Sequence, residues 1–230
     1  MDYQSFLKLI EARRSVRSFK TDPIPDDCVD KIIEAARWAP SGGNSQPWEF
    51  IVIKDQKIKD RIADMVREMG QYTRKVEMTR EEHLRFGGPT SPAREPGYVK
   101  APVFILVLGD PRTKEAYPLL TKLTRGDSHF ASSLASAFLY MTLAATSLGL
   151  GSQWLSATGS PYVKPLLKEL LGIPDKMEIY DMLVVGYTDQ GPKPRFVRER
   201  EDMTHYERFD RARDRSDDEI KQYIANLRKG

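Results

Sequence analysis

One nine-residue stretch organises the N-terminal part of this chain: Glu11-Ala12-Arg13-Arg14-Ser15-Val16-Arg17-Ser18-Phe19. Apolar residues at positions 3, 6, 7 and 10 share one helical face, so a helix is predicted to end just before this stretch. Arginine donates paired, charge-assisted hydrogen bonds to phosphate oxygens. The stretch is therefore a candidate phosphate site with four candidate ligands: Arg13, Arg14, Ser15 and Arg17. The alternative is a solvated basic turn, because runs of charge usually face water.

A second, weaker basic point follows the last predicted strand, at Lys193-Pro194-Arg195. The proline restricts the loop, and the two cations on either side of it could complete the same phosphate site. Taken alone, this tripeptide is equally well explained as part of a surface loop.

The loop between the second predicted helix and the first predicted strand is rich in small and polar residues. It reads Ala39-Pro40-Ser41-Gly42-Gly43-Asn44-Ser45-Gln46-Pro47-Trp48. Small residues let the backbone approach a ligand closely, and the amide side chain can donate hydrogen bonds. A flat ligand against this loop is one interpretation, and an ordinary turn beside a buried tryptophan is the other.

Outward from these motifs, helical and strand patterns alternate. Helices are predicted over 3–10, 29–36, 58–69, 130–148 and 162–171, and strands over 50–53, 103–108, 152–155 and 182–187. This alternation indicates an α/β or α+β protein with a sheet covered on both faces. Residues 70–100 lose clear periodicity and are too long for a simple connection, so we expect a lid or an excursion there.

Composition and motifs exclude several classes of protein. The chain has 230 residues, enough for one large domain, and a net charge of +3, which argues against a nucleic-acid-binding surface. The lone Cys28 excludes an intrachain disulfide and a cysteine-based zinc site. The three histidines show no metal-ligand spacing and are predicted to be structural or exposed: His83, His129 and His205. Gly149-Leu150-Gly151 follows a helix and precedes a strand, so it indicates a helix C-cap with a close backbone approach rather than a dinucleotide fingerprint.

The apolar run 130–148 contains several hydroxyl side chains and is predicted to be a buried core helix rather than a membrane span. The first ten residues carry Asp2, Gln4 and Lys8 where a secretory signal would be apolar. We therefore expect a cytoplasmic protein that has no membrane partner.

Taken together, these pieces resemble the nitroreductase family of FMN flavoproteins. The resemblance rests on the arginine stretch at 11–19 and on Ala39-Pro40-Ser41 followed by Asn44-Ser45-Gln46-Pro47-Trp48. It also rests on Ser147-Leu148-Gly149-Leu150-Gly151 and Leu183-Val184-Val185-Gly186-Tyr187. It extends over roughly residues 3–200 and is weak across 70–100.

The resemblance implies an α+β fold, a three-layer sandwich around a central mixed, mainly antiparallel sheet, in an intertwined homodimer. It implies one FMN-binding domain over 1–200, with 70–100 as a lid or excursion, and a charged extension over 201–230 that can wrap the partner subunit. FMN would lie at each of two subunit interfaces.

The resemblance also assigns cofactor contacts. It carries phosphate and ribityl contacts to Arg13, Arg14, Ser15 and Arg17, completed by Lys193 or Arg195. It places Pro40, Ser41, Gly42 and Asn44 against the flavin from the other subunit, and the backbone around Gln153, Trp154, Leu155 and Ser156 near the isoalloxazine. Arg94 or Lys100 is expected near the pyrimidine edge of the flavin.

The implied activity is an NAD(P)H oxidoreductase in which the chemistry belongs to the flavin and the protein binds, orients and tunes it. NADH or NADPH would reduce the flavin, and a small nitroaromatic, quinone or related acceptor would then take the electrons in a ping-pong cycle. One alternative is a reductive dehalogenase resembling iodotyrosine deiodinase. Its substrate-holding lid would recruit Glu77 or Glu95, Tyr72 or Tyr98, and Lys75 or Lys100. The other alternative is a non-catalytic protein that binds or stores FMN.

Overall fold

The computed structural model describes residues 2–85, 96–191 and 195–227. The chain divides into two compact units. The first comprises Met1–Met69 and Arg94–Pro192, and the second comprises Gly70–Ala93 and Lys193–Gly230.

The first unit is built on a four-stranded sheet. Its strands are β1 (Trp48–Ile53), β2 (Val103–Gly109), β3 (Gly151–Leu155) and β4 (Glu178–Gly186), in the order β1-β2-β4-β3. All three adjacent pairs are antiparallel. Two isolated bridges, Ser15 with Ser152 and Ser18 with Gly97, are parallel. Every residue of β2 is buried, which explains its continuous apolar sequence.

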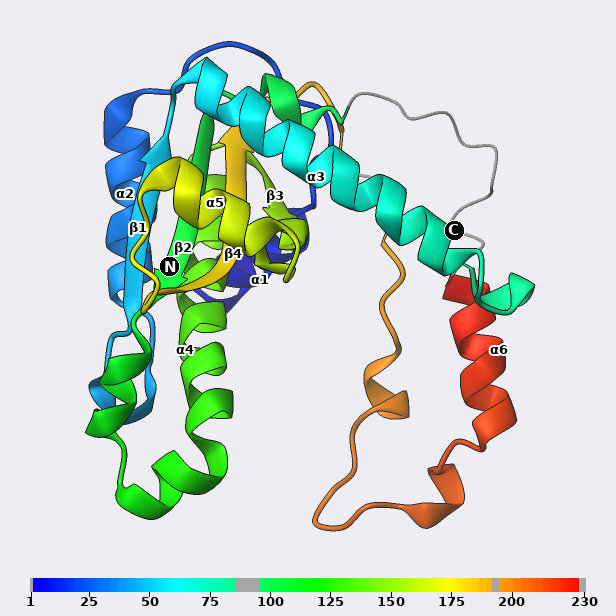
Figure 1. The fold of residues 1–230 in the computed structure, drawn as a ribbon. Helices are drawn as coiled ribbons and strands as arrows, with labels where there is room; N and C mark the ends of the chain where they lie inside the picture. Colours follow the sequence, from blue (N-terminus) through cyan, green and yellow to red (C-terminus); the bar gives the residue numbers. More distant parts are fainter. Residues whose placement is uncertain (1, 86–95, 192–194, 228–230) are drawn as a thin grey trace. The chain divides into compact units, whose positions relative to one another are not determined.

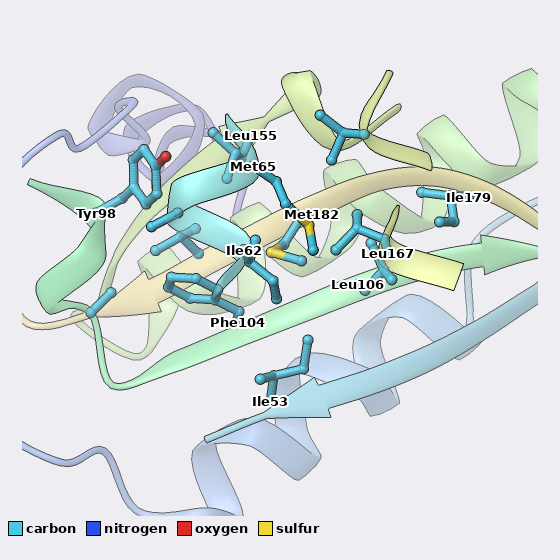
Figure 2. Close-up of a cluster of buried hydrophobic side chains, with 14 of the residues drawn as sticks. Ile53, Ile62, Met65, Tyr98, Phe104, Leu106, Leu155, Leu167, Ile179 and Met182 are labelled. Atoms are coloured by element: carbon cyan, nitrogen blue, oxygen red, sulfur yellow. The ribbon is translucent and has the colours of Figure 1, made fainter. Parts of the chain in front are cut away.

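Helices cover both faces of this sheet and make three layers (Figure 1). One face packs against α2 (Asp26–Arg37) and α4 (Leu119–Ser147), in a core that includes Ile32, Phe138 and Ile105. The other face packs against α5 (Val163–Leu171) and the first part of α3 (Gln56–Glu77). Figure 2 shows Ile62 of α3 and Leu167 of α5 gathered over the strands of this second core. The predicted α+β sandwich is confirmed.

Local signals set several boundaries. Helix α1 (Tyr3–Ala12) starts at Asp2, whose Oδ1 accepts a hydrogen bond from the Ser5 N–H at 2.7 Å. Gly149 takes a φ of 73° just after α4, as a helix C-cap requires. A Cβ on Gly151 would lie 2.9 Å from Val16 Cγ2, so the backbone approach at this position is close. Both features of the Gly149–Gly151 turn match the sequence prediction.

Helix α4 begins at Leu119, well before the predicted start at 130. The apolar pattern is interrupted by Arg125-Gly126-Asp127, which hides the earlier turns from sequence analysis. The helix is long and apolar enough to cross a membrane by length and composition alone. Phe130, Leu134, Ala137, Phe138, Met141 and Ala145 are nevertheless buried against the sheet and α2, so this half of α4 is a core helix.

The second unit contains the end of α3, short 3₁₀ turns and α6 (Asp217–Leu227). Ser216 begins α6 with a reciprocal cap, because Glu219 N–H donates to Ser216 Oγ at 3.3 Å and Ser216 N–H donates to Glu219 Oε2 at 2.7 Å. Tyr223 of α6 lies under the Arg215 guanidinium, 5.1 Å from the ring centre.

We expect Gly97→Ala to destabilise the first unit. A Cβ at this position would lie 2.1 Å from the carbonyl oxygen of Arg17, which is backbone and cannot rotate away. Overpacking of this kind costs about 1–3 kcal/mol, measured as the free energy of unfolding in urea. Gly70→Ala is the matched control, because nothing lies within 4 Å of its Cβ position. In the helix interior that change should stabilise by about 0.5–1 kcal/mol, so equal effects of the two variants would contradict the close approach.

Candidate functional site

The arginine stretch is held against the edge of the sheet by its apolar members. Val16 and Phe19 are buried in the core, and Val16 N–H donates to the Ser152 carbonyl at 2.9 Å. Ser15 and Arg17 alternate with them and are exposed. The local pattern therefore anchors two apolar side chains and leaves the intervening polar ones facing away from the core.

The arginines differ in what they contact. The Arg14 guanidinium donates to the carbonyl oxygen of Arg13 at 3.0 Å and to that of Glu11, so it caps the end of α1. The Arg17 N–H donates to Gln190 Oε1 at 3.2 Å, which ties the stretch to the segment after β4. Arg17's own guanidinium is exposed and remains available to a ligand.

Strand β3 brings the second set of predicted residues beside this stretch. Leu155 is buried in the core, so only its backbone can face a ligand. Gln153 has a buried side-chain Oε1 without a hydrogen-bond partner in the described part of the chain. A buried acceptor of this kind normally has a donor, so a ligand carrying an N–H or O–H group fits here. We call Arg13–Arg17 together with residues 153–156 the arginine half-site.

The polar loop after α2 is pinned onto α4. Gly42 N–H donates to Ser133 Oγ at 3.2 Å, and Gln46 N–H donates to Ser41 Oγ at 3.1 Å. Gly43 takes a φ of 57° and Asn44 a φ of 51°, so the turn uses left-handed backbone at both positions. The predicted contacts Pro40, Ser41, Gly42 and Asn44 thus belong to one ordered turn.

A cavity of about 270 Å³ opens between this turn and α4. Pro40, Ser41 and Gly42 line it on one side, and α4 contributes Arg125, His129, Ser132, Ser133 and Ser136 on the other. We call this cavity and the turn the loop half-site. Sequence analysis missed its α4 side and treated His129 as structural or exposed. The sequence does contain a pattern that could have identified this side: Arg125, His129 and Ser133 are spaced four residues apart, which places them on one face of a helix.

The two half-sites lie at opposite corners of the sheet. The loop half-site precedes Trp48, which pairs with Gly109 at the outer edge strand β1. Ser152, which bridges Ser15 of the arginine half-site, pairs with Val185 at the other edge, and Gly109 pairs with Glu178 at the opposite end of β4. Strand spacing and rise put these corners on the order of 25 Å apart. Figure 1 shows the same arrangement, with β1 and β3 at the two edges.

The remaining predicted site residues lie outside the described residues, in the second unit or in the core. Lys193, Arg94 and Glu95 lie outside the described residues, and Arg195 belongs to the second unit. Tyr98 was one of the two tyrosines that a substrate-holding lid would recruit, but its side chain is only 4% exposed and packs edge-on against Phe104. It is a core residue because its ring fills the space under α3. Burial raises the pKa of its hydroxyl to about 12.

A carboxyl that sequence analysis missed supports the arginine half-site. Asp181 Oδ2 of β4 accepts a hydrogen bond from the Trp154 indole at 2.6 Å, and that indole stacks on Phe138 with ring centres 4.0 Å apart. Burial raises the pKa of Asp181 to about 6, while the Trp154 bond and Lys164 partly oppose the shift. Gly159 is required beside it, since a Cβ there would lie 2.7 Å from Asp181 Oδ1.

Fold and geometry define the class of protein: an α+β sandwich with an arginine-rich half-site and a separate loop half-site. The chain matches the Nitroreductase family model over residues 10–187, and it belongs to that family. A relative from Archaeoglobus fulgidus, provisionally named NADH dehydrogenase/NAD(P)H nitroreductase, is 31% identical over 79% of this chain and 84% of its own length.

Iodotyrosine deiodinases are also similar. The rat protein is 29% identical over 83% of this chain, and the zebrafish (Danio rerio) protein is 30% identical over 80%. The chain spans 65% and 60% of the lengths of these two relatives.

Solved structures share the fold. The NADPH:FMN oxidoreductase from Vibrio harveyi, complexed with NAD+, aligns with a TM-score of 0.69 at 18% identity over 97% of this chain and 84% of its own. A nitroreductase with bound FMN from Bacteroides fragilis aligns with a TM-score of 0.61 at 24% identity over 87% and 98%.

We expect Asp181→Asn to stabilise the protein at neutral pH and to have little effect near pH 4. The folded-state pKa of about 6 exceeds the ordinary value of 3.8, so the stability that the protonated carboxyl provides is complete below about pH 4 and is lost as the pH rises through 6. Asparagine can still accept the Trp154 bond and cannot ionise. Because the carboxyl is partly exposed to solvent, we expect Asp181→Asn to raise the free energy of unfolding at pH 7.5 by only about 1 kcal/mol. Thermal unfolding of both proteins at pH 4 and 7.5 measures it, and a gain of equal size at the two pH values would contradict the shifted pKa.

Proposed function

We propose that this protein is an FMN-dependent NAD(P)H oxidoreductase that reduces small nitroaromatic, quinone or related acceptors by a ping-pong mechanism. The observation that carries the proposal is the split site: an arginine half-site at one corner of the sheet and a loop half-site at the other. Family membership and the FMN in the Bacteroides fragilis nitroreductase support the choice of cofactor.

The residues fit an FMN phosphate and ring. Arg13 and Arg17 can pair with the phosphate, Ser15 can bond the phosphate or the ribityl chain, and Arg14 holds the end of α1 in place. Gln153 supplies the buried acceptor that lacks a donor. Lys193 and Arg195 remain proposed as the completing cations. Bound FMN would supply hydride acceptance and two-electron transfer, which no side chain of the described residues provides.

The protein's own part is to bind, orient and exclude water. The backbone of residues 153–156 would face the ring, and the stacking of Trp154 on Phe138 holds that segment rigid. The overall reaction with a quinone converts NAD(P)H, a proton and the quinone to NAD(P)+ and the hydroquinone. With a nitro compound, the first two-electron step yields the nitroso compound and water.

We further propose that the active form is a homodimer. The two half-sites lie at opposite corners of the sheet, so the loop half-site of a second copy would complete the flavin site of the first. Apolar side chains on two helices are exposed in the single chain: Tyr3, Phe6 and Ile10 on α1, and Leu119, Leu120 and Leu123 on α4. A second copy would bury them. A charged extension over 201–230 that wraps the partner, a lid over 70–100 and a cytoplasmic location remain predictions.

A reductive dehalogenase is the second candidate, favoured by the similarity to the rat and zebrafish iodotyrosine deiodinases. Of the residues expected to hold its substrate, Tyr98 is buried, whereas Tyr72 and Lys100 are exposed. Turnover of a halogenated phenol with release of halide, at a rate exceeding that of quinone reduction, would favour this candidate. Bound FMN without turnover of any acceptor would instead indicate a storage protein.

We expect Arg13→Ala to weaken FMN binding. Losing a charge-assisted hydrogen bond costs about 1.5–3 kcal/mol, or about ten- to a hundredfold in the dissociation constant. Fluorescence titration of the flavin-free protein with FMN measures this constant. Arg37→Ala is the control of equal charge, because its guanidinium is on α2 and pairs with Glu34. An unaltered constant for Arg13→Ala would refute the phosphate assignment.

We expect Leu120→Glu to weaken the dimer and to release FMN, because it places a charge in an apolar surface that a second copy would cover. Sedimentation velocity at micromolar concentration measures the mass, and absorbance near 450 nm measures the flavin. Lys57→Glu on the exposed side of α3 is the control for added negative charge. A monomeric wild-type protein that keeps FMN would contradict the shared site.

A further inference from the structure

We propose that the cavity between the Pro40–Gly42 turn and α4 binds the anionic group of the electron acceptor, held by Arg125 and His129. The inference rests on the proposed function and narrows it, because it selects acceptors that carry a carboxylate or a phenolate. Its basis is the chemistry of the residues that line the loop half-site and the position of that half-site beside the Pro40–Gly42 turn.

Arg125 is the available cation in this cavity. Its guanidinium is exposed and makes no ion pair or hydrogen bond within residues 2–85, 96–191 and 195–227. The acidic side chains nearby in sequence are already engaged, since Asp127 pairs with Lys114 and Glu115 pairs with Lys122. An unpaired guanidinium in a concave surface attracts a carboxylate or phenolate and can bond it through two N–H groups.

His129 lies one helical turn after Arg125 on the same face of α4. Its ring packs edge-on against Tyr117 with centres 5.7 Å apart, which limits its rotation. A Cβ on Gly42 would lie 3.1 Å from His129 Nδ1, so the turn approaches the imidazole closely. The imidazole therefore lies between the cation and the loop that is proposed to face the flavin.

The serines complete a polar wall. Ser133 Oγ is committed, since it accepts from Gly42 N–H and donates to the His129 carbonyl at 2.7 Å. Ser136 Oγ donates to the Ser132 carbonyl at 2.9 Å. The exposed Ser132 hydroxyl makes no hydrogen bond to the described residues and can donate to an anion.

The position of the cavity favours one source of the anion. The 2′-phosphate of NADPH offers the same chemistry as an acceptor carboxylate, so charge alone does not separate them. The cavity is bounded by the Pro40–Gly42 turn, which is proposed to face the flavin. The carboxylate of a small acceptor stays close to the ring that receives the electrons, whereas the 2′-phosphate lies at the adenosine end of NADPH, far from its nicotinamide, so this position favours the acceptor.

The test compares 4-nitrobenzoate with its neutral amide, 4-nitrobenzamide, by calorimetric titration of the oxidised, FMN-loaded protein. We expect the wild type to bind the carboxylate more tightly than the amide. Arg125→Gln should weaken carboxylate binding by about ten- to a hundredfold and leave amide binding within about twofold. Arg125→Lys, which keeps the charge and loses the paired geometry, should recover part of the loss. Lys57→Ala, which removes an exposed lysine of α3 that does not line the cavity, is the control for lost positive charge and should preserve the preference of the wild type.

Three results would overturn the proposal. The first is a wild type that does not distinguish carboxylate from amide, and the second is an Arg125→Gln variant that keeps the preference. The third is a change in the ratio of flavin reduction rates with NADPH and NADH in Arg125→Gln, without a change in carboxylate binding, which would assign the cavity to the dinucleotide phosphate. Failure of the proposed function is distinguishable from these results. In that case the protein would carry no FMN, or neither NADH nor NADPH would reduce the bound FMN, independently of how tightly the carboxylate binds.

Discussion

The hydrogen bond from Val16 N–H to the Ser152 carbonyl, 2.9 Å long, is the contact on which the arginine half-site depends. It closes part of the exposed edge of β3 with a segment that carries three arginines. Gly151 makes the approach possible, because a Cβ there would meet the Val16 side chain at 2.9 Å. The buried Val16 and Phe19 hold the segment, so cations that would repel one another in a free turn stay gathered at one corner of the sheet.

The same sheet geometry separates the two half-sites. The antiparallel order β1-β2-β4-β3 puts the turn before β1 and the start of β3 at diagonal corners. In the proposed dimer, a second copy would bring its loop half-site to the flavin, and the exposed apolar residues of α1 and the beginning of α4 offer a surface for that copy. In this proposal, cofactor binding and dimerisation are linked, so each stabilises the other by mass action.

Polar groups inside the first unit explain where its rigidity comes from. Asp181 bonds the Trp154 indole and lies against Gly159, so it connects β4 with both β3 and the turn that follows it. The cost of burying this carboxyl is visible in its raised pKa of about 6. At the opposite corner, Ser133 bonds both the Gly42 N–H and the His129 carbonyl, which fixes the wall of the cavity around Arg125. Each of the two half-sites is therefore held in place by its own hydrogen bonds.

The sequence by itself determined the core strands, the Gly149–Gly151 turn and the two motifs, because these depend on local periodicity and short-range residue chemistry. Its periodicity left α/β and α+β open, and only the resemblance of its motifs selected α+β. It identified the family through the same motifs. Only the tertiary structure decided that Tyr98 is a core residue, that α4 begins at Leu119, and that Asp181 and Arg125 belong beside the motifs. The physical reason is distance along the chain: Trp154 and Asp181, or Gly42 and His129, meet only after the sheet and α4 have packed. No local pattern contains a contact between residues so far apart in sequence.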